Sequence, residues 1–212
     1  MPDVSSVPVA RSPIPATHDV DVVGGWEVSR RQSSAPLRLQ DATPAAKVLV
    51  RARSDGRCAA VLGVRFGRAE RDHEGTLVVG SGPGEWTLLA APGTAPNIIR
   101  RVLALGDEDE ALVSAVDITH GRALLRLTGA EAAHLLRKLC AIDLDDTVTP
   151  NGAAFRSSVA KLVTDVVRDD RDITRSYLLH CERSSGLYLF QALLDAGEEF
   201  GIEQDGFADA SL

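Results

Sequence analysis

Apolar and polar positions alternate in several short runs along the chain from Lys47 onward. In the first run, VLVRAR at residues 48–53, two valines and an alanine fall on one face and the two arginines fall on the other. Successive side chains of a β-strand point to opposite faces, so this pattern predicts a strand. The same reasoning predicts strands in AAVLGVRF (59–66), TLVV (76–79), EWTLLA (85–90), RALLRL (122–127), KLVTDVVR (161–168) and SYLLHCE (176–182).

Helical spacing of apolar residues predicts three helices, at Pro96–Leu105, about Gly129–Cys140 and about Leu187–Ala196. The first lies between Thr94 and Gly106, residue types that favour the start and the end of a helix. Thr128 and Glu131 have the spacing of a capping box ahead of the second helix. The third helix is followed by Gly197, another stop signal.

An internal repeat is visible when two of these segments are compared. Residues 85–106 align without gaps on residues 176–197, and Trp86 then matches Tyr177. Each copy reads as a strand, a loop that carries hydroxyl groups, and a helix closed by glycine. Chance similarity between two strand–helix units is the alternative to a true repeat. A true repeat predicts an α+β fold of two small, related strand–helix lobes.

Domain boundaries follow from changes in composition along the chain. The acidic stretch GDEDEA indicates a division near residues 107–112, which gives an N-terminal lobe at 25–110 and a C-terminal lobe at 111–203. Residues 1–24 contain four prolines and little apolar periodicity, so we expect a flexible tail there. We expect a second tail at 204–212.

Charge and cysteine content narrow the classes of function. The formal charge of −7 argues against nucleic acid as a partner, because binding to phosphates requires clustered lysine and arginine. No run approaches the roughly 18 apolar residues that span a bilayer, and the N-terminus lacks a signal pattern, so we expect a cytoplasmic protein without a membrane partner. Cys58, Cys140 and Cys181 are odd in number and widely spaced, which favours buried thiols over disulfides or a metal site.

The glycine-rich run GSGPGEW, with Gly80, Gly82 and Gly84, invites comparison with a dinucleotide-binding loop. That loop must leave a strand and open a helix, so that the phosphate meets the N-terminus of the helix. Here the next residues, EWTLLA, read as another strand. The sequence therefore favours a hairpin turn at this run.

The run DITH places Asp117, Thr119 and His120 within four residues, and these are side chains found in catalytic sites. On a strand, Asp117 and Thr119 would share one face and His120 would point to the other. We therefore favour a network that holds the turn at Gly121 over a catalytic cluster. Arg122 and Arg126 are read as solvated or interface charges.

Four aspartates near the end of a predicted strand, Asp165, Asp169, Asp170 and Asp172, are candidates for a cation site or for a general acid. The spacing in VVRDDRDIT does not match a calcium-binding loop. It is typical of an exposed loop, and we predict exposed side chains there.

The segment VDITHGRALLRLTGAEAAHLLRKLCAIDL resembles a segment of the glycine-cleavage T-protein (aminomethyltransferase) and folate-binding superfamily. In that superfamily the segment reads Asp-Val-Ser-His, a strand, a Thr-Gly-Pro-like helix start and an Ile-Asp-Leu or Asn-Asp ending. The matching residues are Asp117, Thr119, His120, Leu125, Leu127, Thr128, Gly129, Ala130, Leu136, Ile142, Asp143 and Leu144. By size and lobe content the nearest branch is the gamma-subunit family of heterotetrameric sarcosine oxidase, which also shares GPGEWTLLA. The resemblance spans about residues 76–203.

Departures from the superfamily pattern bear on activity. Active aminomethyltransferases carry a glycine-rich loop that ends in paired acids, one of which is the catalytic aspartate. The corresponding run here, PNGAAFRSSVAKLVTDVV, lacks that loop, and Asp165 sits within the strand. The resemblance therefore implies a noncatalytic subunit with no metal site and no cofactor of its own. In such a subunit Asp117, Thr119, His120 and Arg122 are structural or contact a partner.

The resemblance also implies partners, namely larger subunits of the alpha, beta and delta types. These would carry FAD, FMN, NAD and tetrahydrofolate, and would oxidatively demethylate sarcosine to glycine. A free-standing tetrahydrofolate-binding or aminomethyltransferase-like protein is the alternative. An independent enzyme that uses the DITH residues is a third reading.

Overall fold

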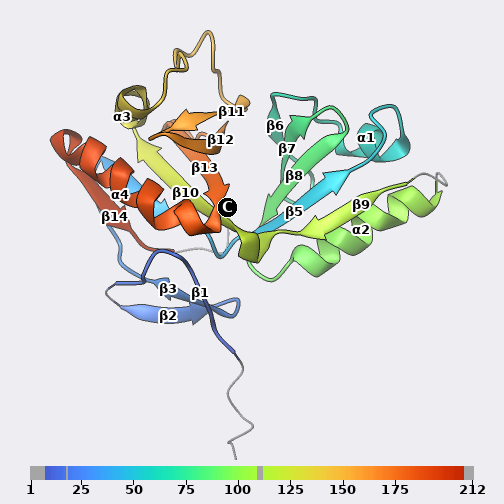
Figure 1. Ribbon diagram of the computed structural model, residues 1–212, viewed down its shortest axis with the longest axis horizontal. Coiled ribbons are helices and arrows are strands. Elements are labelled where there is room, and N and C mark those ends of the chain that lie inside the picture. The colour runs from blue at the N-terminus through green and yellow to red at the C-terminus, as the bar shows by residue number, and fades with distance from the viewer. Residues whose placement is uncertain (1–7, 18, 109–111, 208–212) are drawn as a thin grey trace, which may run out of the picture.

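The computed structural model describes residues 8–17, 19–108 and 112–207 of the chain. Two β-sheets form the body of the molecule (Figure 1). We call each sheet, together with the helices that cover it, a lobe. The larger sheet has the strand order β11 (Ala154–Val159), β12 (Leu162–Arg168), β13 (Ser176–Glu182), β10 (Arg122–Gly129), β4 (Leu37–Asp41) and β14 (Ile202–Asp205). The smaller sheet has the order β6 (Ala69–Arg71), β7 (Leu77–Gly82), β8 (Glu85–Ala90), β5 (Ala46–Arg51) and β9 (Ser114–Asp117). Neighbouring strands are antiparallel, except for the parallel pair β4 and β14.

Helices cover the outer face of each sheet. The elements are α3 (Ala132–Leu139) and α4 (Gly186–Gly197) on the larger sheet, and α1 (Arg57–Leu62) and α2 (Ala95–Glu108) on the smaller one. Leu135 of α3 and Leu193 of α4 are fully buried, and burial of such a side chain stabilises the fold by about 1.5–3 kcal/mol. The inner faces of the two sheets share a further core, in which Leu124 and Leu178 of the larger sheet pack with Leu77 of the smaller.

The two lobes repeat one topology. The element series β4-β5-α1-β6-β7-β8-α2 has the same order as β9-β10-α3-β11-β12-β13-α4. Within the sheets, β6-β7-β8-β5 matches β11-β12-β13-β10, and all of these pairs are antiparallel. The units β8–α2 and β13–α4, which the gapless alignment paired, occupy equivalent places. The predicted α+β fold of two related lobes is confirmed.

The first strand of each repeat crosses into the other lobe. β4 pairs with β10 of the larger sheet, and β9 pairs with β5 of the smaller sheet. The predicted lobes at 25–110 and 111–203 therefore do not coincide with the two sheets, because each range contributes a strand to the opposite sheet. Part of the predicted division near 107–112, residues 109–111, lies outside the described residues.

The N-terminal segment forms a third sheet, with the order β1 (Ala10–Arg11), β3 (Trp26–Ser29) and β2 (Val20–Val23), beside the larger lobe (Figure 1). The predicted flexible tail at 1–24 is wrong for its described part. Trp26 and Val28 pack against Phe207, and the Phe207 amide donates to the carbonyl of Ser29 at 2.8 Å. The tail predicted from residue 204 is wrong where β14 continues to Asp205. Residues 1–7, 18 and 208–212 lie outside the described residues.

Two local predictions differ from the structure. The run AAVLGVRF is not a strand, because helix α1 occupies its first part and ends at Gly63 in the left-handed conformation. The capping box at Thr128 is also wrong, since β10 continues to Gly129 and the Glu131 side chain contacts His134 at 2.7 Å. Short apolar runs and single polar spacings fit more than one element, and tertiary contacts decide between them.

Two of the three glycine-based predictions, one turn and two helix ends, agree with the structure. The GSGPGEW run forms the β7–β8 hairpin, with Gly84 at φ +69°, so the predicted turn is confirmed. Gly106 does not end its helix, because α2 continues to Glu108. Gly197 is the last residue of α4, as predicted.

The remaining short helices are η1 (Thr119–Gly121), η2 (Arg183–Ser185) and η3 (Glu198–Phe200).

Candidate functional site

The exchanged strands oblige two connecting segments to pass each other at the junction of the lobes. Residues 42–45 join β4 to β5, and residues 118–121 join β9 to β10. The Ala42 amide donates to the Leu124 carbonyl at 2.8 Å, and the Ile118 amide donates to the Lys47 carbonyl at 2.9 Å. We call this region the lobe crossover, and the DITH residues lie in it.

Lys47 is the charged centre of the lobe crossover and has no solvent exposure. Its Nζ donates to three carbonyl oxygens, those of Thr43 at 2.7 Å, Ala45 at 2.8 Å and Thr119 at 3.3 Å. Three acceptors match the three hydrogens of an ammonium group. Burial lowers the pKa of Lys47 to about 7, although the Asp41 and Asp117 carboxylates oppose this change. The side chain therefore ties both connecting segments together.

Thr119 is buried and its polar groups are used within the lobe crossover. Its hydroxyl oxygen accepts a hydrogen bond from the Lys47 amide at 3.0 Å. Its own amide donates to Asp117 Oδ1 at 2.9 Å. The Asp117 carboxylate thus holds the turn into η1, the geometry of an Asx turn.

His120 points away from these groups. Its ring stacks on the indole of Trp26, with centroids 4.6 Å apart and an interplanar angle of 13°. The Arg183 guanidinium lies 6.0 Å from the same indole. No described hydrogen bond joins His120 to Asp117, so the three DITH side chains do not form an acid–base series.

Arg122 lies at the start of β10, beside the lobe crossover. Its Nη1 contacts Glu182 Oε1 at 2.7 Å, across the β10–β13 pair. About a quarter of its side chain is exposed, at 27%. Arg122 is therefore a partly exposed charge beside the lobe crossover, paired with a residue of the same sheet.

Arg126 and Asp169 correct two sequence predictions. Arg126 was expected to be solvated or at an interface and Asp169 to be exposed, but both are buried. Arg126 Nη2 contacts Asp169 Oδ2 at 2.7 Å, and its Nη1 donates to the Ser176 hydroxyl at 2.8 Å. Arg71 of the other sheet reaches the same carboxylate at 2.9 Å. This ion cluster bridges the inner faces of the two lobes.

Asp165, a candidate from the sequence, is partly buried and pairs with the buried His180, which the sequence analysis did not single out. Asp165 contacts Arg156 Nε at 2.6 Å and His180 Nδ1 at 3.6 Å. Burial raises the pKa of Asp165, but hydrogen bonds from His180 and Arg156 outweigh it and hold the pKa at about 2. Burial lowers the pKa of His180, whose Nε2 has no partner among the described residues. Asp165 is therefore ionised and paired, which does not suit a general acid.

The other two of the four aspartates differ from each other. Asp170 accepts from Arg168 Nη2 at 2.9 Å, with 15% of its side chain exposed, so the prediction of an exposed loop is wrong for it. Asp172 is exposed, as predicted, and has a positive φ of 53°. Ion pairs with Arg126 and Arg168 thus keep Asp169 and Asp170 largely buried.

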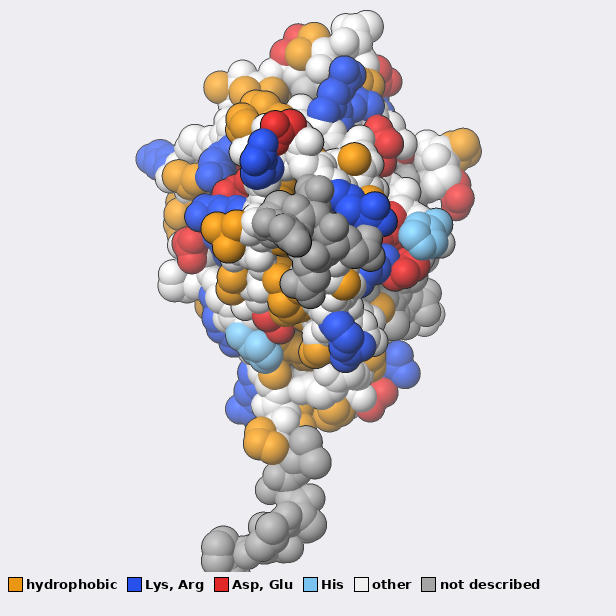
Figure 2. All heavy atoms as spheres, turned by 90° about the vertical axis from the view of Figure 1, so that its right-hand side faces the viewer, with side chains coloured by type: hydrophobic (Ala, Val, Ile, Leu, Met, Phe, Trp, Pro, Cys, Tyr) orange, Lys and Arg blue, Asp and Glu red, His pale blue; other side chains and the backbone are white. Residues whose placement is uncertain are grey.

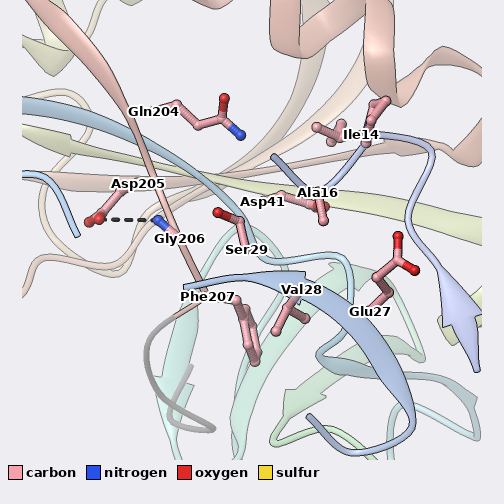
Figure 3. Close-up of a pocket in the computed structure, with 11 residues that line it drawn as sticks. Ile14, Ala16, Glu27, Val28, Ser29, Asp41, Gln204, Asp205, Gly206 and Phe207 are labelled. Atoms are coloured by element: carbon pink, nitrogen blue, oxygen red, sulfur yellow. Dashed lines mark hydrogen bonds between the residues drawn. The ribbon is translucent and has the colours of Figure 1, made fainter. Parts of the chain in front are cut away.

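Hollows in the surface differ widely in size. The one between β3 and the C-terminal segment, lined by Val28, Asp41 and Phe207, has a volume of about 10 Å³ (Figure 3). That is the room of about one water molecule. Two others measure about 630 and 500 Å³, within the range of small-molecule sites. The smaller of these, lined by Phe66 and Phe155, lies between β7 and the strands β11 and β12.

The cysteines and possible metal ligands offer little chemistry. Cys58, Cys140 and Cys181 are free and buried, which confirms the predicted buried thiols. Burial raises the pKa of Cys181 to about 11, so its reactive thiolate form is disfavoured near neutral pH. Among the described residues, no three His, Cys, Asp or Glu side chains are grouped as a metal site would require. Every helix in the described ranges is too short or too polar to span a bilayer.

Comparison with known proteins identifies the family. The profile of the sarcosine oxidase, gamma subunit family matches residues 72–199. The chain belongs to this family. The resemblance drawn from the DITH segment and from GPGEWTLLA is thereby confirmed.

Two relatives of this member of the gamma-subunit family are similar to it along the sequence, and one of them is itself a gamma subunit. The sarcosine oxidase subunit gamma of Corynebacterium sp. (strain P-1) is 31% identical over 130 residues, covering 61% of this chain and 61% of that protein. Human mitochondrial dimethylglycine dehydrogenase is 26% identical over 129 residues, covering 58% of this chain and 14% of that protein. The chain thus spans less than two thirds of the length of either relative.

Solved structures show the same fold. The heterotetrameric sarcosine oxidase from Corynebacterium sp. U-96, in complex with pyrrole 2-carboxylate, matches with a TM-score of 0.67 and 25% identity, over 81% of this chain and 89% of that chain. Aminomethyltransferase T of the glycine cleavage system from Bartonella henselae matches with a TM-score of 0.70 and 14% identity, over 95% of this chain and 61% of that chain. The second likeness concerns the fold alone.

Proposed function

We propose that this chain is a noncatalytic gamma subunit of a cytoplasmic, sarcosine-oxidase-like complex. Its partners are larger subunits of the alpha, beta and delta types, which carry FAD, FMN, NAD and tetrahydrofolate. The complex oxidises sarcosine with O₂, releases glycine and hydrogen peroxide, and passes the methyl carbon to tetrahydrofolate as 5,10-methylene-tetrahydrofolate. Membership of the gamma subunit family, over residues 72–199, supports this role.

The observation that carries the noncatalytic part is the internal use of the DITH groups. Thr119 Oγ1 accepts from the Lys47 amide, Asp117 Oδ1 accepts from the Thr119 amide, and His120 stacks on Trp26. A nucleophile needs a base within about 2.6–3.2 Å, and these three side chains have other partners. These contacts support a structural role for the three side chains at the lobe crossover.

The surface supports a role in assembly. Figure 2 shows apolar side chains reaching the surface between charged ones on the face of the smaller lobe. Exposed apolar residues of that lobe include Val61 of α1, at 57% exposure, and Val116 of β9, at 49%. Apolar surface of this kind becomes buried in obligate assemblies.

The proposal is tested by expressing the full chain alone and together with candidate large flavoprotein subunits. Alone, the chain is expected to be colourless and to associate non-specifically, because its apolar surface lacks partners. Together, it is expected to co-purify in a fixed ratio with flavin-containing subunits, measured by size-exclusion chromatography with absorbance at the flavin band. A yellow, monodisperse monomer with stoichiometric flavin would contradict the proposal.

Substitutions in the DITH residues give a second test. His120→Ala and Asp117→Asn are each expected to lower the free energy of unfolding or of assembly by about 1 kcal/mol, since one removes the stack on Trp26 and the other weakens the bond to the Thr119 amide. Turnover per assembled complex should stay unchanged. His134→Ala, on the exposed face of α3, is the matched control. Transfer of one-carbon units to tetrahydrofolate by the chain alone, lost in Asp117→Asn, would instead favour an independent enzyme.

A further inference from the structure

The hollow of about 630 Å³ lies where the two lobes meet, away from the lobe crossover. Its wall comes from the β6–β7 hairpin, the first turns of α2 and the turn between β12 and β13. The polar side chains that line it are Arg71, Glu74, Thr76, Thr94, Asn97, Arg101 and Arg171. Basic groups therefore dominate its charged lining.

Positive charge is concentrated at one side of this hollow. The Asp169 carboxylate, with 10% of its side chain exposed, is shared by three guanidinium groups. Arg126 contacts it at 2.7 Å, Arg71 at 2.9 Å, and Arg171 only at 3.8 Å. One carboxylate thus faces three cations, and the most distant contact belongs to a residue that lines the hollow.

The acids nearby leave this excess in place. Arg101, the third arginine of the lining, already contacts both Asp72 and Glu74. Asp172, which also attracts Arg171, is exposed to solvent, where screening weakens the attraction. Burial lowers the pKa of Arg171, and the positive charge of Arg71 adds to this effect. A further anion beside Arg171 and Arg71 would offset both the burial of the Arg171 charge and its repulsion by Arg71.

We propose that this hollow binds a small molecule that carries a carboxylate or phosphate group, with Arg71 and Arg171 holding the oxyanion. Guanidinium groups present several N–H donors in a plane, which suits bidentate binding of such groups. Thr76, Thr94 and Asn97 supply neutral donors and acceptors for the remainder of the ligand. The site uses none of the DITH residues, so it stands independently of the proposed subunit role.

The test is equilibrium dialysis of the chain, purified with whatever partners accompany it, against radiolabelled inorganic phosphate and, separately, radiolabelled succinate. Arg171→Gln is expected to weaken binding about tenfold, the effect of losing one charge-assisted hydrogen bond. Asp169 keeps Arg126 and Arg71 in this variant, so the fold should persist, which circular dichroism checks. Arg137→Gln, on the exposed face of α3, is the control and should leave binding unchanged.

Three results would overturn the proposal. One is the absence of binding of either anion at about 10 mM, the weak end of specific affinity. Another is equal binding by Arg171→Gln and the unchanged chain. The third is binding by the free chain that disappears in the complex, which would show that an acidic segment of a partner fills the hollow instead.

Discussion

Replacing Asp169 with alanine is expected to lower the free energy of unfolding by about 3–5 kcal/mol, the range for breaking a buried ion pair. The Arg126 side chain is only 7% exposed and would keep just the Ser176 hydroxyl and the backbone carbonyl of residue 169. Arg71 would lose its contact as well, and it belongs to the other sheet. The substitution therefore leaves buried positive charge unpaired and removes a link between the lobes.

The measurement is urea-induced unfolding at low protein concentration, followed by the fluorescence of Trp26 and Trp86. Asp195→Ala, an exposed carboxylate on α4, is the control and should change stability by less than about 0.5 kcal/mol. Asp169→Leu combined with Arg126→Met should cost less than Asp169→Ala, because apolar replacement of both partners leaves less charge unpaired. A loss below about 1 kcal/mol for Asp169→Ala would show that the pair is not desolvated as the structure indicates.

Local sequence patterns predicted the strands that are buried along most of their length and carry continuous apolar runs. The ranges 85–90 and 176–182, for instance, coincide with β8 and β13. The N-terminal strands gave no such signal, because β2 is exposed at three of its four positions and is held by pairing with β3. In AAVLGVRF the apolar run fitted a strand, but only Cys58 of α1 is buried, and the position of Gly63 closes a helix. Contacts distant in sequence decided these cases.

The buried charges could not be predicted from local patterns either, because contacts distant in sequence bury them. The alternation in RALLRL places Arg126 on one face of its strand, but it does not show that the other lobe covers that face. Lysine is rarely buried, so its position within a strand gave no reason to place Lys47 in the core. The crossing of β4 and β9 between sheets creates both environments, and such an exchange leaves no mark in local periodicity.

Lys47 should make stability depend on pH in a defined direction. In the folded chain its pKa is about 7, whereas its ordinary value is 10.5. Between these values the unfolded chain binds more protons than the folded chain, so the free energy of unfolding attributable to Lys47 rises with pH. The whole difference corresponds to about 5 kcal/mol, of which about 3.5 kcal/mol falls between pH 7 and pH 10. On deprotonation the contact with the Thr119 carbonyl, the longest at 3.3 Å, is the one we expect to be lost.

The variant Lys47→Met isolates this effect, because every other titrating group is common to both chains. At pH 6 the variant is relieved of a buried charge but leaves the carbonyls of Thr43, Ala45 and Thr119 without their donor, so the two effects oppose each other. As the pH rises from 6 to 10, unfolding in urea should show the unchanged chain gaining about 4 kcal/mol relative to the variant. Lys161→Met, at an exposed turn, should show no such gain. A constant difference across this pH range would mean that the three carbonyls keep the ammonium form at the lobe crossover.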